Sequence, residues 1–164
     1  SYLRLDSDST DYVLREYPLD DILRQAVRKF AKMFILKKIT LDFQETGKTV
    51  LTDEKWLLFV VEQVLSNALK YTPAGGTIRI YGDGATVVIA DNGIGIGEEH
   101  LPHIFERFYR IDKGRSRKQG GTGLGLSIVK HGAQVHHAQI AMQSALGEGT
   151  TITLTFPAQS SGKK

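Results

Sequence analysis

Four glycines within nine residues make up the part of this sequence that points most directly to chemistry. The stretch is Lys118-Gln-Gly-Gly-Thr-Gly-Leu-Gly-Leu126, and a run with helical periodicity, residues 124–135, overlaps its end. Glycine lets backbone N–H groups approach a bulky anion closely, and the first turn of a helix leaves such groups without intrahelical partners. The stretch therefore predicts an anion site, and a nucleotide phosphate is the anion that suits it. Taken alone, the motif is equally compatible with an ordinary glycine-rich loop.

A long helix predicted upstream carries a second group of polar residues. Thr52-Asp-Glu-Lys55 caps this helix, which runs from Asp53 to about Tyr71 and has one apolar face. A different face holds polar residues at i, i+4, i+7 and i+8, namely Gln63, Asn67, Lys70 and Tyr71. Asparagine is mildly unfavourable inside a helix, and coordination of a metal ion or a phosphate is one reason for its presence. A solvated helix face is the alternative for each residue alone.

An aspartate followed by spaced glycines forms the third candidate. Asp91-Asn-Gly-Ile-Gly-Ile96 comes directly after the β-branched run Val87-Val88-Ile89, which is typical of a buried strand. A carboxylate at the end of such a strand can accept a hydrogen bond from a ligand amine, and the glycines let a flat ring lie against the backbone. A hairpin turn is the alternative, because Asp-Asn-Gly also has good turn chemistry.

The elements that must position these motifs alternate along the chain. Strands are expected over residues 12–17, 39–43, 49–51, 77–81, 85–90, 140–143 and 150–156. Helices are expected over residues 18–34, 53–71, 98–108 and 124–135. Several strands are joined by turns of hairpin length, as at Asp83-Gly84, so the sheet should be mixed and mostly antiparallel. With about three helices packed against this sheet, the predicted fold class is α+β, a two-layer sandwich.

Length and composition restrict the class of protein. The chain has 164 residues, enough for one domain with a substantial core, and 41% of them are hydrophobic. Its net charge of +3 suits an acidic ligand such as a nucleotide but is too small to indicate nucleic acid. The absence of cysteine excludes disulfides, thiolate metal sites and a cysteine nucleophile. No apolar run approaches the roughly 20 residues that span a bilayer.

Four segments, taken together and in order, resemble the motifs of a known family. They are residues 62–71, 91–96, 105–110 and 121–126. They resemble the N, G1, F and G2 boxes of the ATP-binding catalytic domain of bacterial sensor histidine kinases, in the superfamily that includes gyrase, Hsp90 and MutL. The resemblance covers residues 12–157. It implies a Bergerat-type fold with a mobile ATP lid, and ATP and Mg²⁺ as ligands.

The resemblance also implies roles for single residues around the adenine base and the metal. Asn67 looks like the ligand that holds Mg²⁺ against the triphosphate, Lys70 would reach a phosphate, and Tyr71 would pack on the adenine or the ribose. Asp91 would bond the exocyclic amine of adenine and so select adenine over guanine. The residues that would complete the adenine side are Gly93, Gly95, Ile96 and, through a water molecule, Thr150.

The phosphate side of the site is implied in the same way. The phosphates would lie against Gly121, Thr122, Gly123, Leu124 and Gly125. The lid, residues 111–120, carries charges that could neutralise phosphate, namely Lys113, Arg115, Arg117 and Lys118, although a solvated loop is the alternative for each. Phe105 and Phe108 would anchor the lid and contact a helical partner domain, or else simply pack in the core.

Two positions depart from the family pattern. Gln63 stands where most of these kinases carry a second Asn, and where the gyrase and Hsp90 branch has a water-activating Glu. Because an amide cannot act as a base, we expect poor ATP hydrolysis. With glutamine at this position, the sequence also resembles the small kinases that pair with peptide-antibiotic transporters. Val135-His-His-Ala-Gln139 replaces the usual helix-ending Gly-Gly. His137 or Ala138 would then need a left-handed conformation.

The phosphoacceptor motif of this family, a His followed by an acidic residue and soon by Pro, is missing from the sequence. None of His100, His103, His131, His136 and His137 fits it. We therefore expect no catalytic residue within the chain and an acceptor histidine on a separate dimerisation domain. Residues 1–11 are expected to be the end of that domain's helix or a linker, 12–157 the ATP-binding domain, and 158–164 a disordered tail.

The resemblance implies a partner and a cellular setting as well. The phosphate would pass from the dimerisation domain to a response regulator. The isolated domain is expected to be a monomer and its parent a homodimer, with this domain in the cytoplasm and the parent in the bacterial cell membrane. Two alternatives remain open at this point: a serine kinase of the anti-sigma-factor type, and a non-catalytic nucleotide-binding module.

Overall fold

Seven strands and three helices make up the part of the chain that the computed structural model describes, residues 13–97, 99, 133 and 138–157. In chain order they are β1 (Arg15–Pro18), α1 (Leu19–Lys29), α2 (Ala31–Lys37), β2 (Thr40–Phe43), β3 (Thr49–Thr52), α3 (Glu54–Tyr71), β4 (Thr77–Asp83), β5 (Thr86–Asp91), β6 (Gln139–Ala145) and β7 (Gly149–Thr155). Apart from residues 99 and 133, the helices predicted at 98–108 and 124–135 lie outside the described residues, as does the predicted lid.

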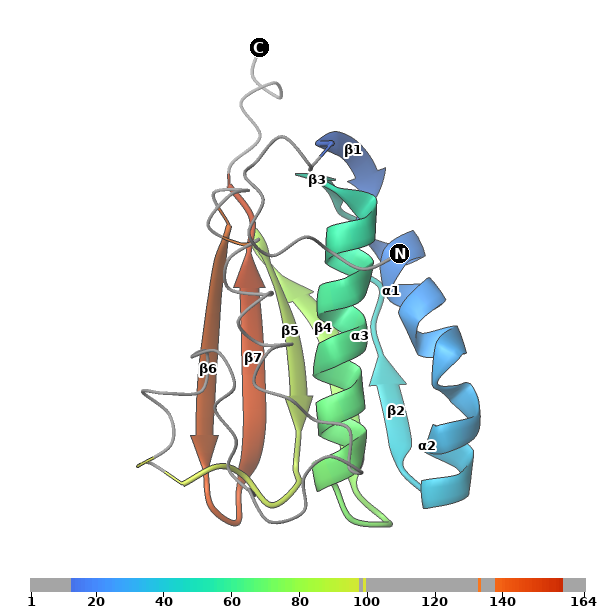
Figure 1. Cartoon of the computed structure of the whole chain (residues 1–164), viewed down its shortest axis with the longest axis vertical. Coiled ribbons are helices and arrows are strands. Elements are labelled where there is room, and N and C mark those ends of the chain that lie inside the picture. The colour runs from blue at the N-terminus through green and yellow to red at the C-terminus, as the bar shows by residue number, and fades with distance from the viewer. Residues whose placement is uncertain (1–12, 98, 100–132, 134–137, 158–164) are drawn as a thin grey trace.

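A five-stranded sheet, in the order β2-β4-β5-β7-β6, forms one layer, and α1, α2 and α3 cover one of its faces (Figure 1). Strands β2 and β4 are parallel, because α3 lies in the connection between them, whereas the other three pairs are antiparallel. A separate antiparallel pair, β1 with β3, lies at the edge. The predicted α+β sandwich with a mixed, mostly antiparallel sheet is confirmed.

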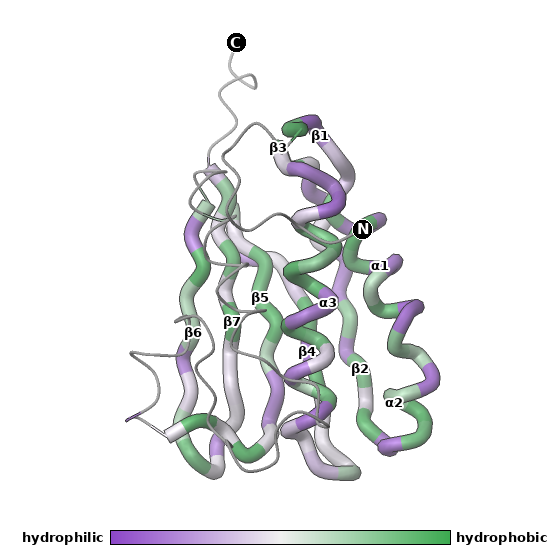
Figure 2. The backbone as a smooth tube through the Cα atoms, in the orientation of Figure 1, coloured by the Kyte–Doolittle hydropathy of each residue, from purple (hydrophilic) through white to green (hydrophobic). Residues whose placement is uncertain are grey.

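The hydrophobic core lies between α3 and α1 and the helix-facing side of the sheet. Trp56 and Leu57 of α3 are fully buried, as are Ile78 and Ile80 of β4. In Figure 2 most of β5 is hydrophobic, and the strand turns hydrophilic only at its lower end. Burying each large aliphatic side chain contributes about 1.5–3 kcal/mol, so this core fixes the rotation of α3 about its axis. None of the described helices combines the length and the apolar character needed to cross a membrane.

The first predicted helix is divided in two and ends later than expected. At Phe30 the backbone leaves the helical region (φ −103°, ψ 10°), and its N–H bonds to Val27 at i−3 instead of i−4. The helix then resumes as α2, which ends at Lys37, beyond the predicted end at Phe34. Lys38 adopts a left-handed conformation (φ 59°), and Ile39 N–H bonds back to Phe34 O, a Schellman-type ending. The sequence offered no glycine to mark this end.

Element boundaries elsewhere shift by a few residues. The helix cap is Asp53, whose Oδ1 accepts a hydrogen bond from Trp56 N at 2.9 Å, so α3 begins one residue later than predicted. The other oxygen of Asp53 accepts from Val13 N at 2.8 Å and ties the start of the described chain to α3. Strand β1 begins later than predicted, at Arg15, and β6 is longer, reaching Ala145.

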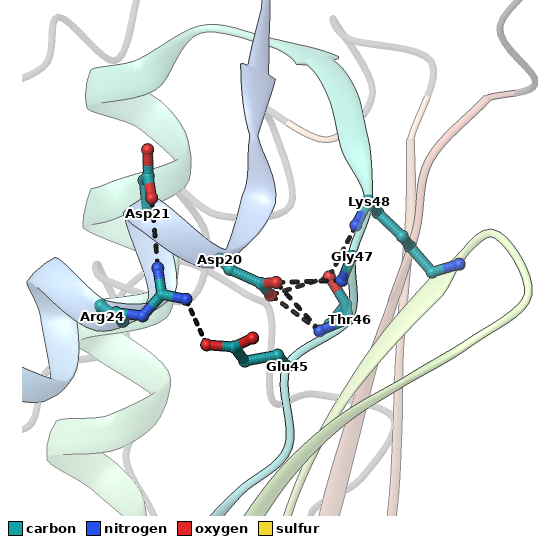
Figure 3. Close-up of polar contacts among 7 residues, drawn as sticks. All are labelled: Asp20, Asp21, Arg24, Glu45, Thr46, Gly47 and Lys48. Atoms are coloured by element: carbon teal, nitrogen blue, oxygen red, sulfur yellow. Dashed lines mark hydrogen bonds and ion pairs between the residues drawn. The ribbon is translucent and has the colours of Figure 1, made fainter.

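A buried carboxylate in the first turn of α1 organises the connection between β2 and β3 (Figure 3). Asp20 accepts hydrogen bonds from Thr46 N at 2.9 Å, from Thr46 Oγ1 at 2.8 Å and from Gly47 N at 2.9 Å. Burial raises the pKa of Asp20, but these bonds and the charge of Arg24 outweigh it and hold the pKa below its usual value. The ionised form therefore stabilises the fold.

We predict that Asp20→Asn destabilises the protein by about 1–3 kcal/mol, because an amide would place a donor against the N–H groups of Thr46 and Gly47. Since the folded pKa is lowered, the wild-type contribution is complete above the ordinary value of 3.8 and is lost as the pH falls through the folded pKa. Urea unfolding from pH 7 to pH 3 measures both effects.

The matched control is Asp21→Asn, which removes a neighbouring, exposed carboxylate that pairs with Arg24 at 3.2 Å. Exposed pairs contribute little, so its unfolding free energy should change by less than about 0.5 kcal/mol. Equal effects for the two variants, or a difference between Asp20→Asn and wild type that stays constant at acid pH, would contradict this role of Asp20.

Candidate functional site

Three segments far apart in the sequence meet at the lower end of the sheet in Figure 1: the end of α3, the loop that follows β5, and the turn between β6 and β7. The peptide groups of Ile94 join them. Its N–H bonds to Tyr71 O at 3.1 Å, and its carbonyl accepts from Gly147 N at 2.8 Å. The Asp91–Gly97 segment singled out in the sequence is therefore held from both sides by backbone hydrogen bonds.

Glycines permit these close approaches. A Cβ on Gly93 would lie 2.4 Å from Tyr71 O, and one on Gly95, where φ is +78°, would lie 1.9 Å from Ala145 O. A Cβ on Gly149, where φ is +96°, would lie 2.0 Å from Asp91 O. No side chain fits at such distances, so glycine is required here by contact with the protein's own backbone.

Asp91 is the acceptor group of this arrangement. It ends β5 opposite Thr150 in the ladder, and its Oδ1 accepts from Gly93 N at 2.9 Å and from Thr150 N at 3.2 Å. Both of these bonds use Oδ1, and among the residues that the structure describes no donor is found for Oδ2, which can therefore accept from a ligand. Burial raises the pKa of Asp91, and the two N–H bonds oppose this only in part. The carboxylate is thus fixed in orientation and partly desolvated.

A pair of hydroxyls, those of Ser144 and Thr150, lies beside Asp91, and only Thr150 was predicted from the sequence. Ser144 Oγ is 2.7 Å from Thr150 Oγ1, donates to Gly149 O at 2.9 Å, and accepts from Ile96 N at 2.7 Å. Ser144 was missed. One signal could have found it: in the alternating pattern of β6, Ser144 follows Ile140 and Met142 on the half-buried face and interrupts it with a hydroxyl.

The predicted polar face of α3 is present. Gln63, Asn67 and Lys70 are half-buried, and Tyr71 is exposed; the Lys70 ammonium lies 5.5 Å from the centre of the Tyr71 ring. The end of this helix is held by Lys37 of α2, whose ammonium donates to the carbonyls of Leu69 and Lys70. A cation at a helix C-terminus is favourable, and the sequence analysis did not identify this one.

A buried hydroxyl completes the described part of the site. Thr72 follows α3 and is fully buried, and its Oγ1 has no hydrogen-bond partner among the residues that the structure describes. This oxygen lies 2.9 Å from the position that a Cβ of Gly93 would occupy. A buried hydroxyl without a partner is unfavourable.

The phosphate side of the predicted site falls outside the described residues. This applies to Lys118, Gly121, Thr122, Gly123, Leu124 and Gly125, to the lid residues Lys113, Arg115 and Arg117, to Phe105 and Phe108, and to all five histidines. The structure thus brings Asp91, Thr150 and the Gly93–Ile96 loop together beside the end of α3. This arrangement can recognise a donor such as an exocyclic amine.

Comparison with known proteins agrees with this geometry. The chain matches the family of histidine kinase-, DNA gyrase B-, and HSP90-like ATPases over residues 52–160. The sensor-like histidine kinase SenX3 of Mycolicibacterium smegmatis is 41% identical over 145 residues, 85% of this chain and 38% of SenX3. The sensor protein BceS of Halalkalibacterium halodurans is 40% identical over 151 residues, 90% of this chain and 45% of BceS.

A solved structure is similar as well. The mycobacterial sensor histidine kinase MprB superposes with a TM-score of 0.75 and 27% identity, covering 88% of this chain and 97% of that chain. The chain spans less than half the length of the two curated relatives named above. SenX3 and MprB are sensor histidine kinases, and this chain belongs to the family of histidine kinase-, DNA gyrase B- and HSP90-like ATPases.

Proposed function

We propose that this chain binds Mg-ATP at the end of the sheet where α3, the β5 loop and the β6–β7 turn meet, and donates the γ-phosphate to a histidine on a separate dimerisation domain. One observation carries the proposal. The Asp91 carboxylate is fixed through Oδ1 by Gly93 N and Thr150 N, while Oδ2 remains available at a loop too crowded for side chains. Oδ2 suits the amino group of adenine.

The residues on the adenine side fit this ligand. Asp91 would accept from the exocyclic amine, with Thr150 beside it acting through a water molecule. Gly93 and Gly95, whose missing side chains let this loop lie against Tyr71 O and Ala145 O, would form the backbone surface beside the base. Ile96, whose N–H is fixed by Ser144, would form part of the apolar wall. Tyr71, 40% exposed at the end of α3, would pack its ring on the adenine or the ribose.

The metal and phosphates would be held from α3 and the glycine-rich stretch. Asn67 would contribute one neutral ligand to Mg²⁺, which keeps several waters and relies on phosphate oxygens for the rest. Lys70 would neutralise phosphate charge, together with Lys118 of the lid. Residues 121–125 would surround the phosphates. When bound, Mg²⁺ would offset the charge of the transferring phosphoryl group.

The chain's own contribution to the reaction would be positioning and charge neutralisation. Gln63 lies on the same helix face as Asn67, one turn before it, and its amide cannot take a proton from water. Transfer to a histidine therefore fits this site better than hydrolysis. In the whole protein the phosphate would pass on to a response regulator, and the parent would be a homodimer in the bacterial cell membrane with this domain in the cytoplasm.

We predict that the chain alone, with Mg-ATP, becomes phosphorylated only negligibly, whereas adding a purified dimerisation domain yields acid-labile phosphohistidine on that domain. Separating the proteins after incubation with radiolabelled ATP, with and without acid treatment, measures this. Rapid phosphorylation of the chain by itself, or acid-stable phosphoserine on the added domain, would contradict the histidine kinase proposal.

We predict that Asp91→Asn weakens ATP binding about ten- to hundredfold, the effect of losing a hydrogen bond to a charged acceptor. The amide can keep the bonds from Gly93 and Thr150 on its oxygen while presenting NH₂ where Oδ2 stood, so the melting temperature should change little. Calorimetric titration of ATP and GTP with and without Mg²⁺ tests this, with Asp83→Asn at the far end of the hairpin as control.

The ATP affinity measured in this titration should also depend on pH. Because burial raises the pKa of Asp91, the accepting, ionised form is lost on acidification before an ordinary carboxylate with a pKa of 3.8 would be. ATP affinity should therefore fall as the pH is lowered, beginning above that value. If Asp91→Asn leaves the ATP affinity unchanged, the adenine base does not bind at Asp91.

We predict that Gln63→Glu raises acceptor-independent ATP hydrolysis at least severalfold, since a positioned general base contributes up to about 10²–10⁴-fold. Phosphate release in the absence of the dimerisation domain measures this. Gln63→Ala, which removes the amide without adding a base, should remain as slow as wild type. Equal rates for all three proteins, with ATP binding intact, would show that residue 63 does not face the attacked phosphate.

A further inference from the structure

We propose that Ser144 is a positioning residue that makes the Thr150 hydroxyl an obligate hydrogen-bond acceptor toward the nucleotide, and so sharpens selection for a base with an amino group. This inference rests on the proposed function, because it assumes that adenine is recognised at Asp91. It extends that function to a residue whose role is to orient another residue.

Ser144 uses its full hydrogen-bonding capacity within the protein. A serine hydroxyl has one hydrogen to donate and two lone pairs. The carbonyl of Gly149 can only accept, so the 2.9 Å contact uses the hydrogen of Ser144. The N–H of Ile96 can only donate, so the 2.7 Å contact uses one lone pair. A single lone pair then remains for the third neighbour, Thr150.

This count of the hydrogen and lone pairs of Ser144 also determines where the hydroxyl hydrogen of Thr150 points. Thr150 Oγ1 lies 2.7 Å from Ser144 Oγ, and since Ser144 has only a lone pair left, Thr150 is the donor in that bond. Thr150 has no second hydroxyl hydrogen. Toward any other partner it can therefore only accept, whether that partner is a water molecule or a nucleotide amine.

The position of Thr150 is tied to the group that would read the base. Its backbone N–H donates to Asp91 Oδ1 at 3.2 Å, and the two residues are partners in the β5–β7 ladder. Gly149, which receives the Ser144 hydrogen, packs against the Asp91 carbonyl so closely that a Cβ there would be 2.0 Å away. Ser144, Thr150 and Asp91 thus form one connected unit.

This unit presents only acceptors, Asp91 Oδ2 and Thr150 Oγ1. A purine with an amino group at C6 supplies the matching donor, whereas a purine with a carbonyl there would place an acceptor against acceptors. Removing the Ser144 hydroxyl would release the hydrogen of Thr150, which could then turn toward the nucleotide and satisfy a carbonyl, directly or through the linking water molecule. Ser144 would in this way affect the choice of base without touching it.

The test compares ATP with ITP, in which a carbonyl replaces the C6 amino group and N1 carries a hydrogen. Both are titrated by calorimetry into wild type, Ser144→Ala and Ser144→Thr, with melting temperatures recorded. We expect Ser144→Ala to lower the ratio of ATP to ITP affinity about five- to tenfold. Ser144→Thr, which restores a hydroxyl, should recover most of the ratio. Ser66→Ala on α3 is the matched control for loss of a serine hydroxyl elsewhere, and it should leave the ratio unchanged.

Thr150→Val provides a second test for the case that Ser144→Ala folds poorly. Thr150→Val removes the hydroxyl at nearly constant shape and should lower the ratio similarly, and the double variant should lose no more than either single variant. Equal weakening of ATP and ITP, or an unchanged ratio in variants that still bind ATP through Asp91, would overturn the role of Ser144 while leaving the proposed function standing. Failure of wild type to bind ATP at all would overturn both.

Discussion

The candidate site depends on one constraint, the direct backbone contact that holds the β5 loop between the end of α3 and the β6–β7 turn. Ile94 uses both its N–H and its carbonyl in this contact, and Gly93, Gly95 and Gly149 lie where a Cβ would meet another backbone at 2.4 Å or less. Backbone groups held in this way have few alternative conformations. The atoms that would face a nucleotide base are therefore positioned before it arrives, which is the condition for selective binding at low entropic cost.

The rest of the structure supplies the supports for that contact. The core fixes the rotation of α3, and Lys37 holds its last carbonyls, so Tyr71 O is in place to receive Ile94 N. The β5–β7 ladder places Thr150 opposite Asp91. On the other side of the molecule, Asp20 closes the β2–β3 connection and holds α1 against it. The polar supports, from Lys37, Thr150 and Asp20, each consist of hydrogen bonds made within the protein.

The chemistry that follows from this arrangement is one of selection and placement. Asp91 and Thr150 present acceptors, α3 presents amides and an ammonium, and Gln63 offers no base for activating water. A phosphoryl transfer reaction needs little covalent help from the protein when the acceptor is brought to a bound and neutralised triphosphate. A site of this kind would gain its reactivity from a partner domain, which fits the lack of a phosphoacceptor motif in the sequence.

Periodicity and local turn chemistry were enough to predict much of this protein. The two faces of α3, the β-branched run before Asp91 and the hairpin at Asp83-Gly84 are patterns of residues close in sequence, and the α+β sandwich followed from them. The resemblance added roles that remain predictions, including those of the glycine-rich stretch at 120–125. Boundaries were less certain, because the break at Phe30 and the left-handed Lys38 depend on packing that no local motif announces.

Only the tertiary structure could reveal the contacts that connect distant segments. Asp20 reaches Thr46 across 26 residues, Lys37 reaches Leu69 across 32, Ile96 reaches Ser144 across 48, and Thr150 reaches Asp91 across 59. Such pairs leave no periodic trace, because a hydrogen bond depends on where two elements lie in space and not on their spacing along the chain. The sequence by itself therefore determined which residues could recognise a nucleotide, while the packing of the sheet against α3 decided which atoms of those residues remain available to do so.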